Sequence, residues 1–170
     1  MRRIFLLAFL FLVIFNLQAQ ESNIKRNVVN LELAGSGILY SFNYDRLLII
    51  DQNMRFTVNA GTWYIPHFED YTDFKIMVGG VVGFNTLIGQ EKHFAELGVN
   101  LSYMYLQDID DLKYHMAYLP IRLGYRYQKD EGGLFYRASF MPMISIFQDA
   151  DAEILYPVTP HFALGIGYAF

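Results

Sequence analysis

The stretch that decides the fold is Pro160-His161-Phe162-Ala163-Leu164-Gly165-Ile166-Gly167-Tyr168-Ala169-Phe170. Large apolar side chains alternate in it with small ones: one parity holds Phe162, Leu164, Ile166, Tyr168 and Phe170, and the other holds Ala163, Gly165, Gly167 and Ala169. Successive side chains of a β-strand point to opposite faces of the sheet. The alternation therefore predicts a strand with one bulky apolar face and one nearly bare face.

The first residues of the sequence have the three parts of a secretory signal peptide. Arg2 and Arg3 form a positive segment, residues 4–15 are apolar, and Ala19 is a small residue at the expected cleavage point. The apolar segment is shorter than the ~20 residues that a spanning helix needs. We therefore predict a cleaved signal peptide at residues 1–19.

Composition limits the class of the remaining chain. Residues 20–170 suit one domain, and the sequence is 54% hydrophobic and 17% aromatic without a long apolar run after residue 19. Hydrophobicity divided into short alternating segments is typical of a transmembrane barrel. The net charge of −4 and the lack of a Lys/Arg stripe argue against a nucleic-acid partner. The absence of cysteine excludes disulfides, thiolate metal ligands and thiol nucleophiles.

Eight segments have the strand pattern, each with one apolar parity. They are residues 26–35, 38–47, 54–64, 75–88, 94–106, 116–128, 134–147 and 160–170. Their charged residues fall on the parity opposite the apolar one, apart from Arg46; the face of Lys75, at the start of its segment, is left open. A soluble barrel has the reverse arrangement, and a Lys or Arg facing lipid costs up to roughly 2–4 kcal/mol. The predicted fold is therefore all-β: a single eight-stranded antiparallel up-and-down transmembrane β-barrel.

The connections between these segments alternate in length. Residues 89–93 and 129–133 are tight, whereas 65–73, 107–113 and 148–159 are longer. Transmembrane barrels have short periplasmic turns and longer external loops. We therefore expect the tight turns and Phe170 at the periplasmic end and the long connections outside.

Three segments carry a resemblance to a known class of proteins. Residues 40–46 (Tyr-Ser-Phe-Asn-Tyr-Asp-Arg), 124–127 (Gly-Tyr-Arg-Tyr) and 165–170 (Gly-Ile-Gly-Tyr-Ala-Phe) resemble the small outer-membrane barrels of Gram-negative bacteria, in particular an uncharacterised group. The resemblance implies location in the outer membrane and no particular activity. It also implies that the barrel assembly machinery recognises the terminal strand, through Phe162, Leu164, Ile166, Tyr168 and Phe170.

Seven charged residues are predicted to face the barrel interior: Glu32, Asp45, Arg55, Glu96, Arg122, Arg126 and Arg137. Pairing the fifth and sixth strands about their loop sets Glu96 opposite Arg126 and Asn100 opposite Arg122. An eight-stranded barrel is only wide enough for its own side chains, and buried charges must be paired. The set is therefore interpreted as a charge network that fills the interior, with an ion path as the alternative.

Two prolines suggest a different function. Pro120 and Pro142 lie in neighbouring strands at nearly the same height, and neither can donate a backbone hydrogen bond. Lipid A palmitoyltransferase barrels are similar in this respect, so the alternative function is a lipid A-modifying acyltransferase or deacylase with a lateral lipid entrance, for which His115 and Asp111 are the candidates. Bulges that bend the barrel are the structural interpretation.

The residues indicate no catalytic centre, no metal site and no cofactor. Asp149-x-Asp151-x-Glu153 has the spacing of a calcium loop, but Ile154 stands where that loop needs glycine. We expect a non-enzymatic, monomeric protein whose partners are outer-membrane lipid, lipopolysaccharide and the assembly machinery.

Overall fold

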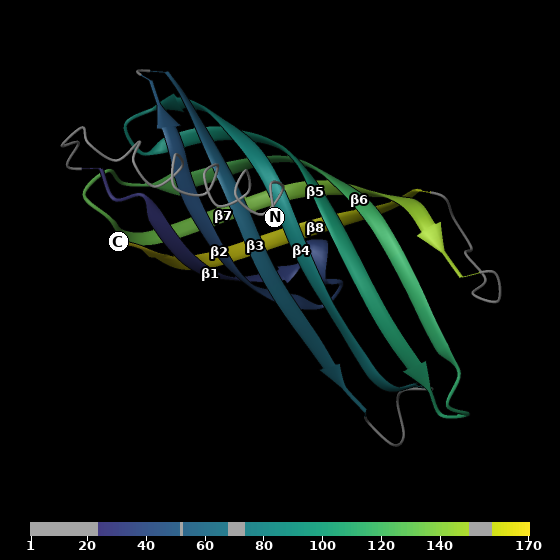
Figure 1. Cartoon of the computed structure of the whole chain (residues 1–170). Helices are drawn as coiled ribbons and strands as arrows, with labels where there is room; N and C mark the ends of the chain where they lie inside the picture. The colour runs from purple at the N-terminus through teal and green to yellow at the C-terminus, as the bar shows by residue number, and fades with distance from the viewer. Residues whose placement is uncertain (1–23, 52, 68–73, 150–157) are drawn as a thin grey trace, which may run out of the picture.

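The computed structural model describes residues 24–51, 53–67, 74–149 and 158–170, so the predicted signal peptide lies outside the described residues. Eight antiparallel strands form a closed barrel in which each strand pairs with its sequence neighbours and the last pairs with the first (Figure 1). The strands are β1 (Asn27–Ala34), β2 (Tyr40–Ile50), β3 (Met54–Pro66), β4 (Phe74–Gln90), β5 (His93–Asp108), β6 (Lys113–Gln128), β7 (Gly133–Gln148) and β8 (Val158–Ala169). One short 3-10 turn, η1 (Gly35–Gly37), joins β1 to β2. The predicted all-β, eight-stranded up-and-down barrel is confirmed.

The terminal stretch closes the barrel. β8 pairs with β7 on one side and with β1 on the other, from Val28 opposite Ala169 to Ala34 opposite Ala163. Beyond the strand end, the backbone N–H of Phe170 donates to the Asn27 carbonyl at 2.8 Å, and the Asn27 N–H donates back at 3.1 Å. Closure leaves neither edge of the sheet unpaired, which only a barrel achieves.

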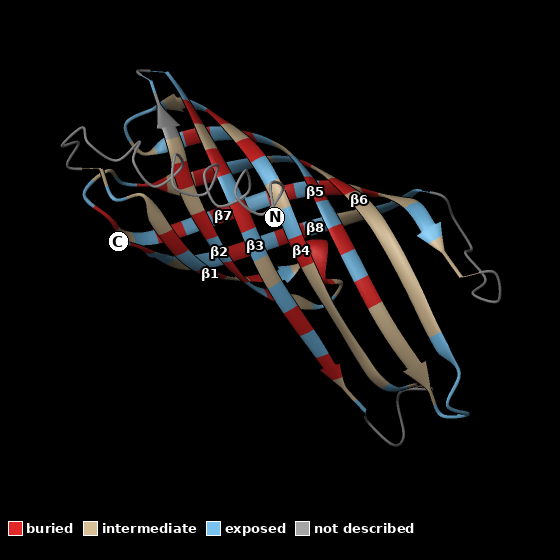
Figure 2. Ribbon diagram, viewed as in Figure 1, coloured by how far each residue is buried: buried red, intermediate tan, exposed pale blue. Residues whose placement is uncertain are grey.

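Burial alternates along the strands as the parity predicts. Figure 2 shows buried and exposed residues following one another along most ribbons, with long intermediate stretches on β4 and β6. On β8, Phe162 is 70% exposed and Leu164 is 63% exposed, whereas Ala163 between them is 1% exposed. The large apolar residues therefore cover the outside of the barrel.

Some strand bounds differ from the predicted ones. β2 begins at Tyr40, and Ile38 was wrongly predicted to face outward: it packs inside against the cluster of Trp63, Ile65 and Met104. The reason is local, because Ile38 has a φ of 66°, which breaks the strand geometry just before β2. β4 to β7 are all longer than predicted, so the barrel is much taller on that side than at the short β1–β2 connection (Figure 1).

The connections follow the predicted alternation of length only in part, because the β5–β6 connection, residues 109–112, is as short as the β6–β7 connection, residues 129–132. Glu91 and Lys92 alone separate β4 from β5, with Glu91 in the left-handed region at a φ of 55°. The tight turns lie at the same end as the carboxyl terminus (Figure 1). Parts of the β3–β4 and β7–β8 connections lie outside the described residues. No helix in the described part of the chain is long and apolar enough to cross a membrane.

The interior of the barrel, the lumen, is layered. Two apolar clusters lie toward the tight-turn end, one of Val28, Phe135 and Ala169 and one of Leu47, Leu87 and Phe94. The Trp63 cluster lies toward the opposite end. Buried polar and charged residues occupy the space between these clusters. The apolar layers screen the polar layer from solvent at both ends.

The η1 turn forms part of the lumen. Its three residues are buried, and it contacts β4, β5, β7 and β8 as well as the two strands that it joins. The Ser102 hydroxyl on β5 donates to the Ser36 carbonyl at 2.8 Å. A short connection that folds inward therefore covers the charged layer from above.

Candidate functional site

Three carboxylates and three arginines meet in the middle of the lumen, and we call these six residues the lumen network. They come from five strands: Glu32 from β1, Asp45 from β2, Glu96 from β5, Arg122 and Arg126 from β6, and Arg137 from β7. Each stands on the inward parity of its strand, and each side chain is at most 2% exposed. The charges balance within the set, as buried charges require.

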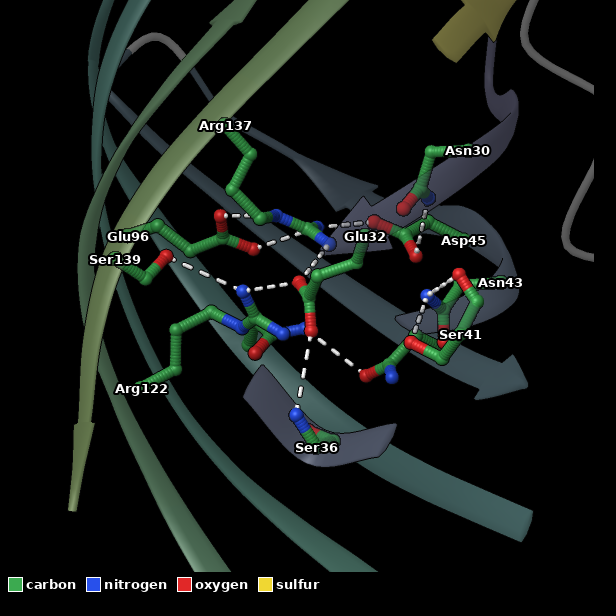
Figure 3. A network of polar contacts seen from close by, with 12 residues as sticks. Asn30, Glu32, Ser36, Ser41, Asn43, Asp45, Glu96, Arg122, Arg137 and Ser139 are labelled. Carbon is green, nitrogen blue, oxygen red and sulfur yellow. Dashed lines mark hydrogen bonds and ion pairs between the residues drawn. The ribbon is translucent and has the colours of Figure 1, made fainter. Parts of the chain in front are cut away.

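Arg137 is the centre of the network, and Figure 3 shows its guanidinium between acidic groups from three strands. Its Nε donates to Glu96 Oε2 at 2.8 Å, and its Nη2 donates to Glu96 Oε1 at 2.9 Å, which is a bidentate pair. Nη2 also donates to Asp45 Oδ2, and Nη1 lies 3.6 Å from Glu32 Oε2. One arginine thus joins all three carboxylates.

Arg126 completes the pairing of Asp45. Its Nη1 donates to Asp45 Oδ2 at 2.9 Å and lies 3.5 Å from Glu96 Oε1. Its Nε and Nη2 donate to Gln128 Oε1 at 3.0 and 2.6 Å. The Phe135 ring lies 4.7 Å from the Arg126 guanidinium carbon and 5.0 Å from that of Arg137. A cation over an aromatic face is stabilised by the ring quadrupole, so Phe135 supports both arginines from below.

Arg122 forms the other end of the network. Its Nη1 lies 2.7 Å from Glu32 Oε2 and donates to the Ser139 hydroxyl at 3.2 Å. The Ser36 backbone N–H in η1 donates to Glu32 Oε1 at 3.5 Å (Figure 3). Glu32 is therefore held between an arginine of β6 and the inward-folded turn.

The seventh predicted residue, Arg55, lies in the lumen but outside the network. It forms a bidentate pair with Asp130 in the β6–β7 turn, at 2.6 and 3.1 Å, and its guanidinium lies 4.5 Å from the Phe94 ring. Arg55 stands near the start of β3, at the tight-turn end, and the cluster that contains Phe94 lies at that end too. Its partner is 39% exposed, so this pair is much more accessible to water.

The predicted register between β5 and β6 was wrong by two residues. Glu96 is opposite Gly124, Phe94 is opposite Arg126, and Gly98 is opposite Arg122. The turn between these strands is tighter than predicted, and within it the Asp108 carboxylate accepts from the backbone N–H groups of Asp110 and Leu112 at 2.9 Å each. A shift of two residues preserves parity, so Glu96 and Arg126 still face the lumen and still meet.

The prolines lie at interruptions of the hydrogen-bonded ladder. Between β5 and β6 the described pairs stop at Val99–Ile121 and resume at Ser102–Tyr118, which leaves out Pro120. Between β6 and β7 they stop at Pro120–Met143 and resume at Leu123–Phe140, which leaves out Pro142. The buried side chains beside these gaps include Asn100, Met141 and Arg122, of which Arg122 is a member of the charged network.

The catalytic candidates for lipid modification do not meet. Asp111 accepts hydrogen bonds from Lys75 and Gln107, each at 2.8 Å. The His115 ring instead bonds the Tyr103 hydroxyl at 2.5 Å, and its backbone N–H donates to Asp149 at 2.8 Å. Within the described ranges, no group of three or more His, Asp or Glu residues could hold a metal ion. The calcium-like spacing falls mostly outside the described residues.

Sequence reasoning missed several uncharged residues of the site. Phe135 shares the inward parity of Arg137, so parity alone could have identified it. Gln128 shares the parity of Arg126 in the same way. No pattern in the sequence predicts that Ser36 folds back into the lumen, because its inward position depends on the space beside Glu32 in the closed barrel.

Comparison with known proteins supports the fold alone. No protein-family model matches the chain, and no curated protein matches it. Among solved structures, the chain is similar to the N-terminal β-barrel domain of Pseudomonas aeruginosa OprF, with a TM-score of 0.53 and 13% identity over 89% of this chain and 100% of that chain. It is also similar to Ail, the attachment invasion locus protein of Yersinia pestis, with a TM-score of 0.48 and 13% identity over 85% of this chain and 94% of that chain.

Proposed function

We propose that this protein is an integral outer-membrane β-barrel whose lumen is filled by its own side chains and which has a structural or interaction role in the cell envelope. The observation that carries the proposal is the inverted distribution of residues. Asp45, Glu96 and Arg126 are fully buried inside the barrel, whereas apolar side chains of every strand are exposed on its outside. This arrangement is stable when the surroundings are hydrocarbon.

The size of the exposed apolar surface supports the membrane location. Its members include Val29, Phe42, Val58, Val82, Leu97, Leu123, Phe140 and Leu164, which lie on the eight strands in turn and are each 37–63% exposed. Soluble monomers rarely expose contiguous apolar patches of more than a few hundred Å². A lipid bilayer covers such a surface all the way around, as no single protein partner would.

The lumen network supports a closed barrel rather than a channel. An interior path for ions would have to pass the six charged residues, which are already paired with one another. Opening it would leave carboxylates or guanidinium groups without partners, which costs several kcal/mol for each ion. We infer that the network stabilises the barrel and that the external connections carry any interaction with a partner.

The comparisons give no support to the lipid A-modifying alternative, and the residues near the ladder gaps do not favour it. The lumen beside Pro120 and Pro142 holds Arg122 paired with Glu32. A buried ion pair is a poor surface for an acyl chain. The prolines are better interpreted as places where the sheet bends.

The remaining assignments follow from the membrane location. We infer that a cleaved signal peptide at residues 1–19 directs export, that β8 with its alternating Phe162, Leu164, Ile166, Tyr168 and Phe170 is recognised by the barrel assembly machinery, and that the barrel is a monomer surrounded by lipid and lipopolysaccharide.

Membrane fractionation tests the proposal. We expect the protein in the outer-membrane fraction, extracted only by detergent, with faster migration in unheated than in heated gel samples because the folded barrel resists the detergent. Recovery in the soluble fraction would contradict the membrane location. In planar bilayers we expect no steady conductance, and a selective, persistent current would show that the lumen is open.

A further inference from the structure

Arg46 is the exception to the segregation of charge. It lies on β2 with the outward parity of Phe42 and Tyr44, so its side chain belongs to the apolar face of the barrel. Its Nη1 donates to the Asn27 side-chain carbonyl at 2.8 Å, and the Tyr44 hydroxyl donates to the same oxygen at 2.7 Å. Among the residues that the structure describes, the Arg46 guanidinium has no ion pair and no further hydrogen bond. Its position is held, but its charge is not neutralised.

A groove on the outer surface begins at this residue, and we call it the outer groove. It has a volume of about 640 Å³. Its lining includes Arg46 and Tyr44 of β2, Ala60 of β3, Val82 of β4 and Leu119 of β6. The small side chain of Ala60, opposite Tyr44 on one side and Val82 on the other, lowers the surface between larger neighbours. The groove is thus almost wholly apolar except for one cation.

The groove has a direction relative to the barrel. Arg46 lies close to the end of β2 at Ile50, beside the tight-turn end, whereas Leu119 lies near the middle of β6. A cationic group at one end of an apolar groove that leads toward the middle of the barrel has the same polarity as a phospholipid, with its phosphate at the membrane interface and its chains in the hydrocarbon.

We propose that Arg46 and the outer groove bind one glycerophospholipid of the inner leaflet, with the phosphate on the guanidinium and one acyl chain along the groove. This inference rests on the proposed membrane location. Arginine presents planar, paired donors that match a phosphate, and such charge-assisted bonds are strong where water is scarce. Lipid binding also explains why a cation is tolerated on this face.

Two other occupants fit less well. In a second copy of the chain, the strand carboxylates Glu32, Asp45 and Glu96 are buried in the lumen, so the described middle of its outer face offers Arg46 no anion. Lipopolysaccharide carries phosphates, but it belongs to the outer leaflet, whereas Arg46 lies toward the periplasmic end of the proposed topology. A neighbouring groove of about 720 Å³, lined by residues such as Val29, Phe42 and Ile166, contains no cation and serves as an internal comparison.

Native mass spectrometry of the full-length protein in detergent tests the proposal, with dioleoyl phosphatidylglycerol as the probe and dioleoylglycerol as the same chains without phosphate. We expect one phosphatidylglycerol to be retained by the unmodified protein in preference to dioleoylglycerol. Arg46→Gln should weaken its retention about tenfold, as for the loss of one charge-assisted contact. Arg46→Lys should weaken it less. The matched control is Lys129→Gln, an exposed cation at the same end of the barrel, which should change nothing.

The acyl site has its own pair of variants. Ala60→Leu fills the groove and should reduce retention of both lipids, whereas Ala138→Leu, the same change on the outward face of β7, should not. Equal retention by Arg46→Gln and the unmodified protein would overturn the proposal, as would tighter binding of purified lipid A. A cross-linked dimer that Ala60→Leu abolishes would show that a second copy occupies the groove.

Each variant is also run in the heat-shift gel, which separates the two possible failures. If the unmodified protein shows no heat shift and needs no detergent, the membrane location is wrong. If the shift is normal in every variant and retention does not depend on Arg46, the barrel is in the membrane and only the lipid site is wrong.

Discussion

Removal of Arg137 is the most severe test of the lumen network. In Arg137→Met the side chain keeps much of its volume but loses the guanidinium that joins Glu96, Asp45 and Glu32. A hydrogen bond to a charged group contributes roughly 1.5–3 kcal/mol, and both Glu96 and Asp45 would lose one or more. We expect the free energy of unfolding to fall by about 3–5 kcal/mol, which is the range for breaking a buried ion pair by deleting one partner.

The chain carries its own reporter for this measurement. Trp63 is its single tryptophan and is 2% exposed inside the lumen, so its fluorescence follows unfolding by urea in lipid vesicles. The matched control is Arg55→Met, because Arg55 is also a lumen arginine but pairs with the half-exposed Asp130. The free energy of unfolding should fall by only about 1 kcal/mol in Arg55→Met, since solvent screens the Arg55–Asp130 pair.

A double-mutant cycle separates charge imbalance from lost packing. Arg137→Met combined with Glu96→Gln restores the charge balance, so the double variant should be more stable than the sum of the two single losses predicts, by about 1–3 kcal/mol. Two results would refute the reasoning that the six residues act as one buried network. One is a fall of less than about 1 kcal/mol in the free energy of unfolding of Arg137→Met, and the other is a double variant whose fall equals the sum of the two single ones.

Three further predictions concern separate parts of the molecule. Gly79→Ala should lower the free energy of unfolding by about 1–3 kcal/mol, because the added Cβ would lie 2.4 Å from both a Trp63 ring carbon and the Tyr103 carbonyl oxygen. In the control variant Gly80→Ala the nearest contact of the added Cβ is 3.7 Å, so urea unfolding should show almost no change in stability. An equal fall in the free energy of unfolding in both variants would contradict the packing argument. Hydrogen bonds from Lys75, and to a smaller extent from Gln107, lower the pKa of Asp111. The Lys75–Asp111 contact should therefore persist above the usual pKa of an aspartate and be lost as the pH falls through the lowered value. An NMR titration should show that the pKa of Asp111 rises in Lys75→Gln, and an unchanged pKa would contradict this explanation. Phe170→Ala keeps the backbone hydrogen bonds to Asn27 but removes the terminal ring. Cells should therefore accumulate less heat-modifiable protein, while the purified variant refolds in micelles nearly as well as the unmodified protein. A refolding defect as large as the loss of folded protein in cells would show that Phe170 acts on stability instead of assembly.

Parity alone predicted most of the barrel. The period of two in a strand requires no knowledge of its partners, so the inward position of Glu32 and the outward position of Leu164 could be read from the residues between them. The same rule places Arg46 on the apolar face from the alternation of residues 40–46 by itself. The position of Ile38 could not be found in this way, because its positive φ interrupts the alternation.

Pairing within the lumen was decided only by the tertiary structure. Asp45 and Arg137 are far apart in the sequence and meet because closure of the barrel brings β2 and β7 to opposite sides of one narrow interior. The β5–β6 register came with a tighter turn than the sequence predicted, and the cover over Glu32 depended on the inward fold of η1. A strand's own residues determine which face each side chain takes, but the turns and the width of the closed barrel determine which side chains touch. That distinction separates the charged set that the sequence predicted from the six-residue network that the fold assembles.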